Sequence, residues 1–103
     1  MAATYPIRGL PAMHPGELLR EDVVPALNRS ISELAELLGV SRQTLHSILS
    51  EEQSVTPAMA LRLGKLCGNG PELWLNLQAR YDLEREGRAM AEAIERIPTL
   101  TAG

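Results

Sequence analysis

The sequence predicts an all-α protein with a single small domain. A chain of 103 residues has room for one hydrophobic core, and 45% of its residues are hydrophobic, which argues against disorder. The core must be aliphatic, because the chain has no Phe, one Trp and two Tyr. Ala and Leu outnumber the β-branched residues, and this composition favours helices over strands.

Charge and cysteine content exclude several classes of protein. Ten Lys and Arg against 13 Asp and Glu give a net charge of -3, so a strongly cationic surface for nucleic acid is excluded, although a local basic contact is not. The single cysteine, Cys67, cannot form an internal disulfide, and with His14 and His46 it cannot complete a four-ligand zinc site. No apolar run approaches the roughly 18 residues of a membrane span. We therefore expect a soluble, cytoplasmic protein with no cofactor, no metal and no membrane partner.

The first helix is expected to begin near His14. Residues 1–12 contain two prolines, a glycine and no periodicity, and we expect them to form a flexible lead-in. Pro15 then falls in the first helical turn, where a residue without an N–H is tolerated. Pro25 is expected to interrupt this helix, because a proline inside a helix removes a hydrogen bond.

Two short helices joined by a glycine follow, and they are the most informative pattern in the chain. Ser30 and Glu33 have the spacing of a capping box, which starts a helix that ends at Gly39. Ser41 can cap a second helix directly after the turn. The apolar positions have helical spacing and are Ile31, Leu34, Ala35 and Leu38 in the first helix, and Leu45, Ile48 and Leu49 in the second.

The second half of the chain predicts two further helices. Thr56 and Pro57 form an N-cap and a first turn, and the helix that they begin ends near Gly68. Pro71 opens the last long helix. Whether that helix passes Gly87 is open, because a glycine inside a helix costs about 1 kcal/mol.

The two short helices have the features of a helix-turn-helix. Ala35 is the small residue where two helices can cross, Gly39 reverses the chain, and apolar anchors hold the second helix at a fixed angle. Arg42 could bind guanine O6 and N7, and Gln43 could bind adenine N6 and N7, in the major groove of DNA. Double-stranded DNA is therefore the predicted partner, and the alternative is an ordinary helical hairpin with a solvated face. The outer, N-terminal residues of the second helix include no acid and are Ser41, Arg42, Gln43, Thr44, His46 and Ser47.

Each of these polar residues receives a predicted role. Ser30, Ser41 and Thr44 are candidates for phosphate contacts, because helix N-termini offer N–H groups to phosphates. The candidates for base contacts are Arg42, Gln43, Ser47 and His46, with a merely solvated His46 as an equal alternative. The segment is poor in cations, so a single copy would bind weakly and a dimer is expected. Its charged residues are Arg29, Arg42 and Arg62 against Glu33, Glu36, Glu51 and Glu52.

The last helix carries a candidate dimer interface. A Trp flanked by Leu on both sides is more than one face of a surface helix can bury within a protomer. The alternative is that these side chains belong to an ordinary core. The candidate interface residues recur at i, i+3 and i+7 and are Trp74, Leu77 and Tyr81.

Three motifs make the chain resemble a known family. They are the opening segment Met13-His14-Pro15-Gly16-Glu17-Leu18-Leu19, the run LAELLGVSRQ at residues 34–43, and PELWLNLQ at residues 71–78. Together they resemble the HigA-type antitoxins, small helix-turn-helix members of the phage-repressor (XRE/Cro) family, over residues 13 to 85. The resemblance implies a five-helix, lambda-repressor-like fold and a homodimer built from the C-terminal helices. It also implies repression of the protein's own operon and neutralisation of a RelE-like mRNA endonuclease toxin.

The resemblance ranks the candidate residues and divides the chain. By position in the repressor-like fold, Arg42, Gln43 and Ser47 are the best candidates for reading bases. The family usually has a basic, glycine-containing loop after the recognition helix, where this chain has Ser50-Glu51-Glu52-Gln53-Ser54. That departure suggests weaker affinity or a different docking angle. The expected parts are the lead-in (1–12), the helix-turn-helix domain with its fifth helix (13–86), and a C-terminal extension (87–103) that is partly helical and then frayed.

Other functions have less support from the sequence. Two alternatives to an antitoxin are a stand-alone transcriptional repressor without a toxin and a protein-interaction module that does not bind DNA. The sequence has no Gly-rich phosphate loop, serine elbow or catalytic carboxylate pair, so an enzyme is not expected. Cys67 is interpreted as a structural thiol, and His14 with Glu17 as a contact at the helix start rather than part of a metal site.

Overall fold

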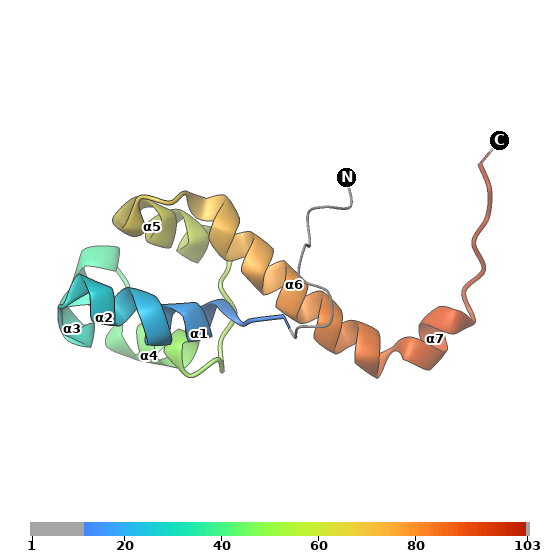
Figure 1. The fold of residues 1–103 in the computed structure, drawn as a ribbon, viewed down its shortest axis with the longest axis horizontal. Helices are drawn as coiled ribbons and strands as arrows, with labels where there is room; N and C mark the ends of the chain where they lie inside the picture. Colours follow the sequence, from blue (N-terminus) through green and yellow to red (C-terminus); the bar gives the residue numbers. More distant parts are fainter. Residues whose placement is uncertain (1–11, 103) are drawn as a thin grey trace.

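The protein is all-α, as its sequence predicts. The computed structural model describes residues 12–102, and these contain helices and no strand (Figure 1). The expected lead-in at residues 1–12 lies, apart from Ala12, outside the described residues. The helices are α1 (Pro15–Leu18), the π-helical turn η2 (Leu19–Val23), α2 (Val24–Leu27), α3 (Ile31–Leu38), α4 (Arg42–Leu49), α5 (Pro57–Cys67), α6 (Pro71–Ala89) and α7 (Ala91–Glu95).

The first helical segment continues through Pro25 instead of stopping there. α1, η2 and α2 follow one another up to Leu27, which corrects the expectation that Pro25 interrupts the helix. In a regular helix the proline ring would collide with the carbonyl four residues earlier. The chain avoids this collision by widening to a π-helical turn, in which the Val24 N–H donates to the Leu19 carbonyl five residues back. Asn28, in the left-handed conformation (φ 54°), ends the segment.

The three predicted N-caps are confirmed. In each, a side-chain hydroxyl accepts a hydrogen bond from an N–H three residues later, which satisfies a donor that the helix itself leaves unpaired. Such a cap stabilises a helix by about 1 kcal/mol. The pairs are Ser30 with Glu33 at 3.1 Å, Ser41 with Thr44 at 3.0 Å, and Thr56 with Met59 at 3.2 Å.

The helix-turn-helix forms at α3 and α4 as predicted. Ala35 is buried where the two helices cross. Gly39 ends α3 in the left-handed conformation (φ 75°), which glycine adopts without strain, and its N–H donates to the Glu36 carbonyl at 3.1 Å. The Arg62 guanidinium of α5 donates to the Leu38 carbonyl at 2.7 Å, so the end of α3 is satisfied from a neighbouring helix.

The core lies between η2, α3, α4, α5 and the first half of α6. Trp74 is 0% exposed in this core, and its Nε1 donates to Asn69 Oδ1 at 3.1 Å. The prediction that Trp74 lies in a dimer interface is therefore wrong, because an indole buried in its own protomer has no surface left for a second copy. Leu77 and Tyr81 are half-buried, and their place in an interface stays a prediction.

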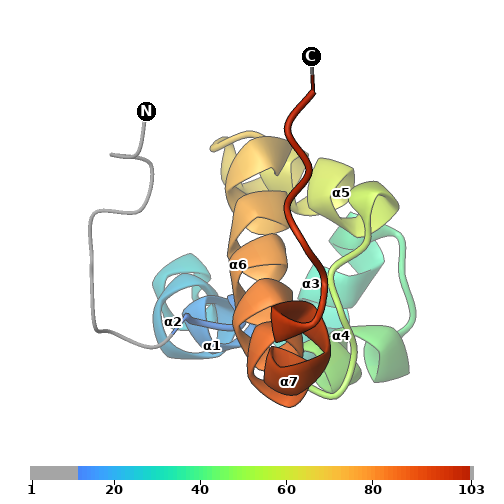
Figure 2. The same cartoon turned by 90° about the vertical axis from the view of Figure 1, so that its right-hand side faces the viewer.

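α6 runs through Gly87, which settles the question left open by the sequence, and carries the chain away from the core (Figure 1). The molecule measures 53 Å along its longest axis and 27 and 26 Å along the others. We call residues 83–97 the arm and residues 12–82 the body. Figure 2 is turned by 90° from Figure 1 and shows α7 at the end of the arm, in front of the body. The structure describes every residue of the arm and buries none, and its exposed large apolar side chains are Leu83, Met90, Ile94 and Ile97.

Candidate nucleic-acid interface

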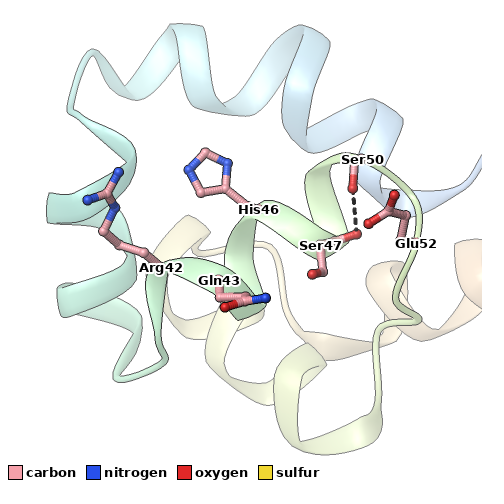
Figure 3. A pocket seen from close by; sticks show the side chains of 6 residues that line it. All are labelled: Arg42, Gln43, His46, Ser47, Ser50 and Glu52. Carbon is pink, nitrogen blue, oxygen red and sulfur yellow. Dashed lines mark hydrogen bonds between the residues drawn. The ribbon is translucent and has the colours of Figure 1, made fainter.

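The outer face of α4 is open to solvent. Arg42, Gln43 and His46 are exposed and Ser47 is half-buried, so the four residues predicted to contact bases lie together on one surface. Figure 3 shows them along a groove of about 530 Å³, with Arg42 near one end and Glu52 near the other. The residues lining this reading groove are Arg42, Gln43, His46, Ser47, Ser50 and Glu52.

The inner face of α4 fixes the orientation of the helix. Leu45, Ile48 and Leu49 are buried in the core. α1 packs so closely on the end of α4 that a Cβ at Gly16 would collide with the Ile48 carbonyl. Because packed interiors leave little room for such a helix to roll, the polar face of α4 is held at one angle. A recognition helix needs this fixed angle to enter a major groove.

Two of the three hydroxyl groups predicted to contact phosphates, those of Ser30 and Ser41, serve as helix caps. The Ser41 hydroxyl accepts from the Thr44 N–H and donates to Thr44 Oγ1 at 2.9 Å, and the Ser30 hydroxyl caps α3. Ser30 and Ser41 are exposed and Thr44 is half-buried. The starts of α3 and α4 therefore lie at the surface, where first-turn N–H groups can face an anion.

The loop after α4 is held by an arginine that the sequence analysis did not identify. Arg20 of η2 donates to the Leu49 carbonyl at 2.7 Å and forms an ion pair with Glu51 at 3.2 Å. Glu51 has a left-handed backbone (φ 67°), which a glycine would adopt more easily. Arg20 thus compensates the charge of one of the two loop carboxylates that depart from the family pattern.

The far end of the same loop is fastened by Gln78 of α6, which the sequence analysis also missed. This buried side chain accepts from the Val55 N–H at 2.8 Å through Oε1 and donates to Asp82 Oδ1 at 3.0 Å through Nε2. An amide bonded at both ends holds its partners in place. No local spacing could reveal Arg20 and Gln78, because their loop partners Glu51 and Val55 lie 31 and 23 positions away in the sequence.

Glu52 differs from its neighbour Glu51. Its side chain is exposed and lines the reading groove (Figure 3), whereas Glu51 is half-buried beside Arg20 and is not among the lining residues. The Glu52 N–H donates to the Ser47 carbonyl at 2.9 Å, which ties the residue to the last turn of α4. The groove therefore has a cation towards one end and a carboxylate towards the other.

His14 contacts the helix start, as the sequence predicts. Its Nδ1 accepts from the Gly16 N–H at 2.8 Å, and its ring packs edge-on against Tyr81 with 4.9 Å between centroids. Burial lowers the pKa of His14 more than the carboxylates of Glu51 and Asp82 raise it, so the imidazole is neutral at pH 7. Within residues 12–102, no group of three His, Cys, Asp or Glu could hold a metal ion.

Cys67 has the properties of a structural thiol. It is a free, half-buried cysteine at the end of α5. Burial raises the pKa of its thiol, which disfavours the reactive thiolate. Among residues 12–102, no helix has the length and hydropathy needed to cross a membrane.

Comparison with known proteins identifies the same domain. A family model described as helix-turn-helix matches residues 19–75. Virulence-associated protein I of Dichelobacter nodosus is 40% identical over 75 residues, which are 73% of this chain and 69% of that protein. The structure of the Pseudomonas aeruginosa antitoxin HigA with the higBA promoter has a TM-score of 0.81 and 33% identity, over 87% of this chain and 99% of that one. The structure of antitoxin GraA in complex with its operator has a TM-score of 0.83 and 38% sequence identity, over 93% of this chain and 98% of that one.

These similarities extend beyond the helix-turn-helix. The family model begins in η2 and ends in α6, so it spans more than half of the chain. The two antitoxin structures align with most of the chain, and their identity to it exceeds 30%. The chain therefore belongs to the helix-turn-helix family and, within it, to the HigA-type antitoxins.

Proposed function

We propose that the protein is a DNA-binding antitoxin that binds operator DNA as a homodimer, represses its own operon and neutralises a RelE-like mRNA endonuclease toxin. The observation that carries the proposal is the outer face of α4, where four predicted base-reading residues line one open groove on a helix held by its buried face. The two related antitoxins solved with promoter or operator DNA support it.

In the proposed complex, α4 lies in the major groove. Arg42 and Gln43, in its first turn, bind a guanine and an adenine edge, and His46 and Ser47 face neighbouring bases. The N–H groups at the starts of α3 and α4 bind phosphates beside Ser30, Ser41 and Thr44. Backbone donors thus compensate for the few cations on this surface.

The homodimer brings two copies of α4 to one duplex. Within residues 12–102, nothing covers the large apolar side chains of the arm, and Leu83 is 68% exposed. Burying such a surface between two copies is favourable, and a two-fold axis repeats each contact. Leu77 and Tyr81 adjoin this surface on α6 and complete the proposed interface. In the dimer the two α4 helices lie about 34–36 Å apart, or a multiple of one DNA turn.

The proposed binding to operator DNA is tested with a duplex from the region upstream of the protein's own gene. In fluorescence anisotropy, we expect tighter binding to this duplex than to an unrelated one by at least about 10³-fold. The logarithm of the affinity should fall linearly with the logarithm of salt concentration. No binding at low salt would contradict the proposal and favour the protein-interaction module.

The proposed neutralisation of a toxin is tested by expressing this protein together with the product of a neighbouring gene. A small basic protein encoded beside this gene should stop growth when expressed alone, and the antitoxin should restore growth and purify with it. A neighbour that neither inhibits growth nor binds would leave a stand-alone repressor as the function.

A further inference from the structure

The reading groove on α4 contains an unexpected carboxylate, Glu52 (Figure 3). A carboxylate beside a DNA phosphate is repelled, because both carry negative charge. In the major groove it is favourable beside a hydrogen-bond donor, and the donors there are the exocyclic amino groups, cytosine N4 and adenine N6. Glu52 therefore suits the selection of a base and not general affinity for DNA.

The backbone holds Glu52 in a defined place. Its N–H and that of Gln53 both donate to the Ser47 carbonyl, at 2.9 and 3.1 Å, and the Glu51 N–H donates to the Ile48 carbonyl at 3.0 Å. Arg20 binds the Leu49 carbonyl just before this turn. Because the main chain of Glu52 is already fixed, it loses little backbone entropy when the side chain binds, which favours a precise contact.

The charge of Glu52 is available to a ligand. None of the ion pairs among residues 12–102 includes Glu52, whereas Glu51, the next residue, pairs with Arg20. Arg42 lies near the opposite end of the groove (Figure 3). The groove is thus polarised along α4, with a donor at the start of the helix and an acceptor beyond its end.

We propose that Glu52 is a specificity-determining residue that accepts a hydrogen bond from the exocyclic amino group of a base. The inference rests on the proposed binding of DNA by α4. It adds a statement of which base edge, one with an exocyclic amino group, contacts Glu52. Arg42 selects purine acceptors near the other end. The two opposite preferences fix the direction in which each half-site is read.

Selection from a random-sequence duplex library tests the proposal with matched variants. Glu52→Gln keeps the size of the side chain, but its amide both donates and accepts and so no longer requires a donor. We expect wild type to prefer cytosine or adenine at one position of each half-site by about tenfold, and Glu52→Gln to reduce this preference below about threefold. Preferences at the other positions should persist. Glu36→Gln, which removes the same charge from α3, is the control and should keep the wild-type pattern, because Glu36 is exposed, lies outside the groove lining and forms none of the ion pairs among residues 12–102.

The outcomes separate this inference from the proposed function. Identical base preferences in wild type and Glu52→Gln overturn it, even if the affinity for every sequence rises, because the carboxylate then acts on phosphates alone. If wild type enriches no sequence, DNA recognition itself fails and this inference falls with it. The selected base distinguishes cytosine N4 from adenine N6. The thermal unfolding midpoints of both variants should match that of wild type, so that a changed base preference reflects the altered side chain and not a loss of folding.

Discussion

The body and the arm use hydrophobic residues in opposite ways. In the body they converge on one core, where Trp74 is 0% exposed, whereas in the arm Leu83 and Ile97 are 68% and 66% exposed. Trp74 and Leu83 belong to the same helix, α6, so helix formation alone does not decide their burial. What differs is whether other elements of the protomer cover them. The body therefore contains the hydrophobic core, and the arm has apolar side chains that no other described residue of the protomer covers.

Replacing Trp74 should give the largest effect and confine it to the body. Trp74→Ala removes a fully buried side chain and should lower the free energy of unfolding by about 3–5 kcal/mol. Leu83→Glu changes an exposed residue, and we expect monomer stability to stay within about 0.5 kcal/mol while the proposed dimer dissociates. Urea unfolding and light scattering measure the two effects. A stable but monomeric Trp74→Ala protein would restore Trp74 to the interface.

Two glycine substitutions sharpen the comparison. A methyl group at Gly16 would collide with the Ile48 carbonyl, so Gly16→Ala should destabilise the body by about 1–3 kcal/mol. Gly87, inside α6, has no atom within 4 Å of an added Cβ, so Gly87→Ala should stabilise the arm helix by about 1 kcal/mol. Thermal unfolding gives the sign of each change. A Gly16→Ala protein as stable as wild type would contradict the packing described for α1 on α4, and a destabilising Gly87→Ala would contradict the open space around Gly87.

The smallest of these effects is expected from acid, which should weaken the contact of His14, at the start of α1, with Tyr81 of α6. Burial lowers the pKa of His14 in the folded protein, so the unfolded chain binds a proton first as the pH falls. The His14 contribution to stability is present above the unfolded value of about 6.5 and is lost as the pH drops through the lower folded value. His14→Asn keeps a capping acceptor that does not titrate. Urea midpoints from pH 7.5 to 5 should therefore fall less in the variant, and parallel curves would count against a buried neutral imidazole.

Local parts of the fold follow from local sequence. The caps at Ser30, Ser41 and Thr56 each join residues three positions apart, and the turn at Gly39 requires one residue in a left-handed conformation. The side of α4 that faces outward follows from the helical spacing of its apolar residues. For this reason the sequence predicts both the helix-turn-helix and the outward position of the candidate base-reading residues, which share one groove.

Features that depend on residues far apart in the sequence cannot be predicted from local sequence patterns. The spacing around Trp74 gives an apolar helix face but not what covers it, and the cover is this protomer's own core. The rule that proline stops a helix does not anticipate the π-helical turn before Pro25. The contacts of Arg20 and Gln78 join elements far apart in the chain, and they position the loop that carries Glu52.

Operator binding by Arg42→Ala is the most direct test of the central claim, that α4 presents base-reading side chains at a fixed angle. Arg42 is exposed and lies outside the arm, so the variant should fold and stay dimeric. We expect fluorescence anisotropy to show binding to the operator weakened by about 1–3 kcal/mol, with discrimination lost at one base pair of each half-site and little change on unrelated DNA. Equal losses on the operator and on unrelated DNA, or no loss on either, would contradict the account.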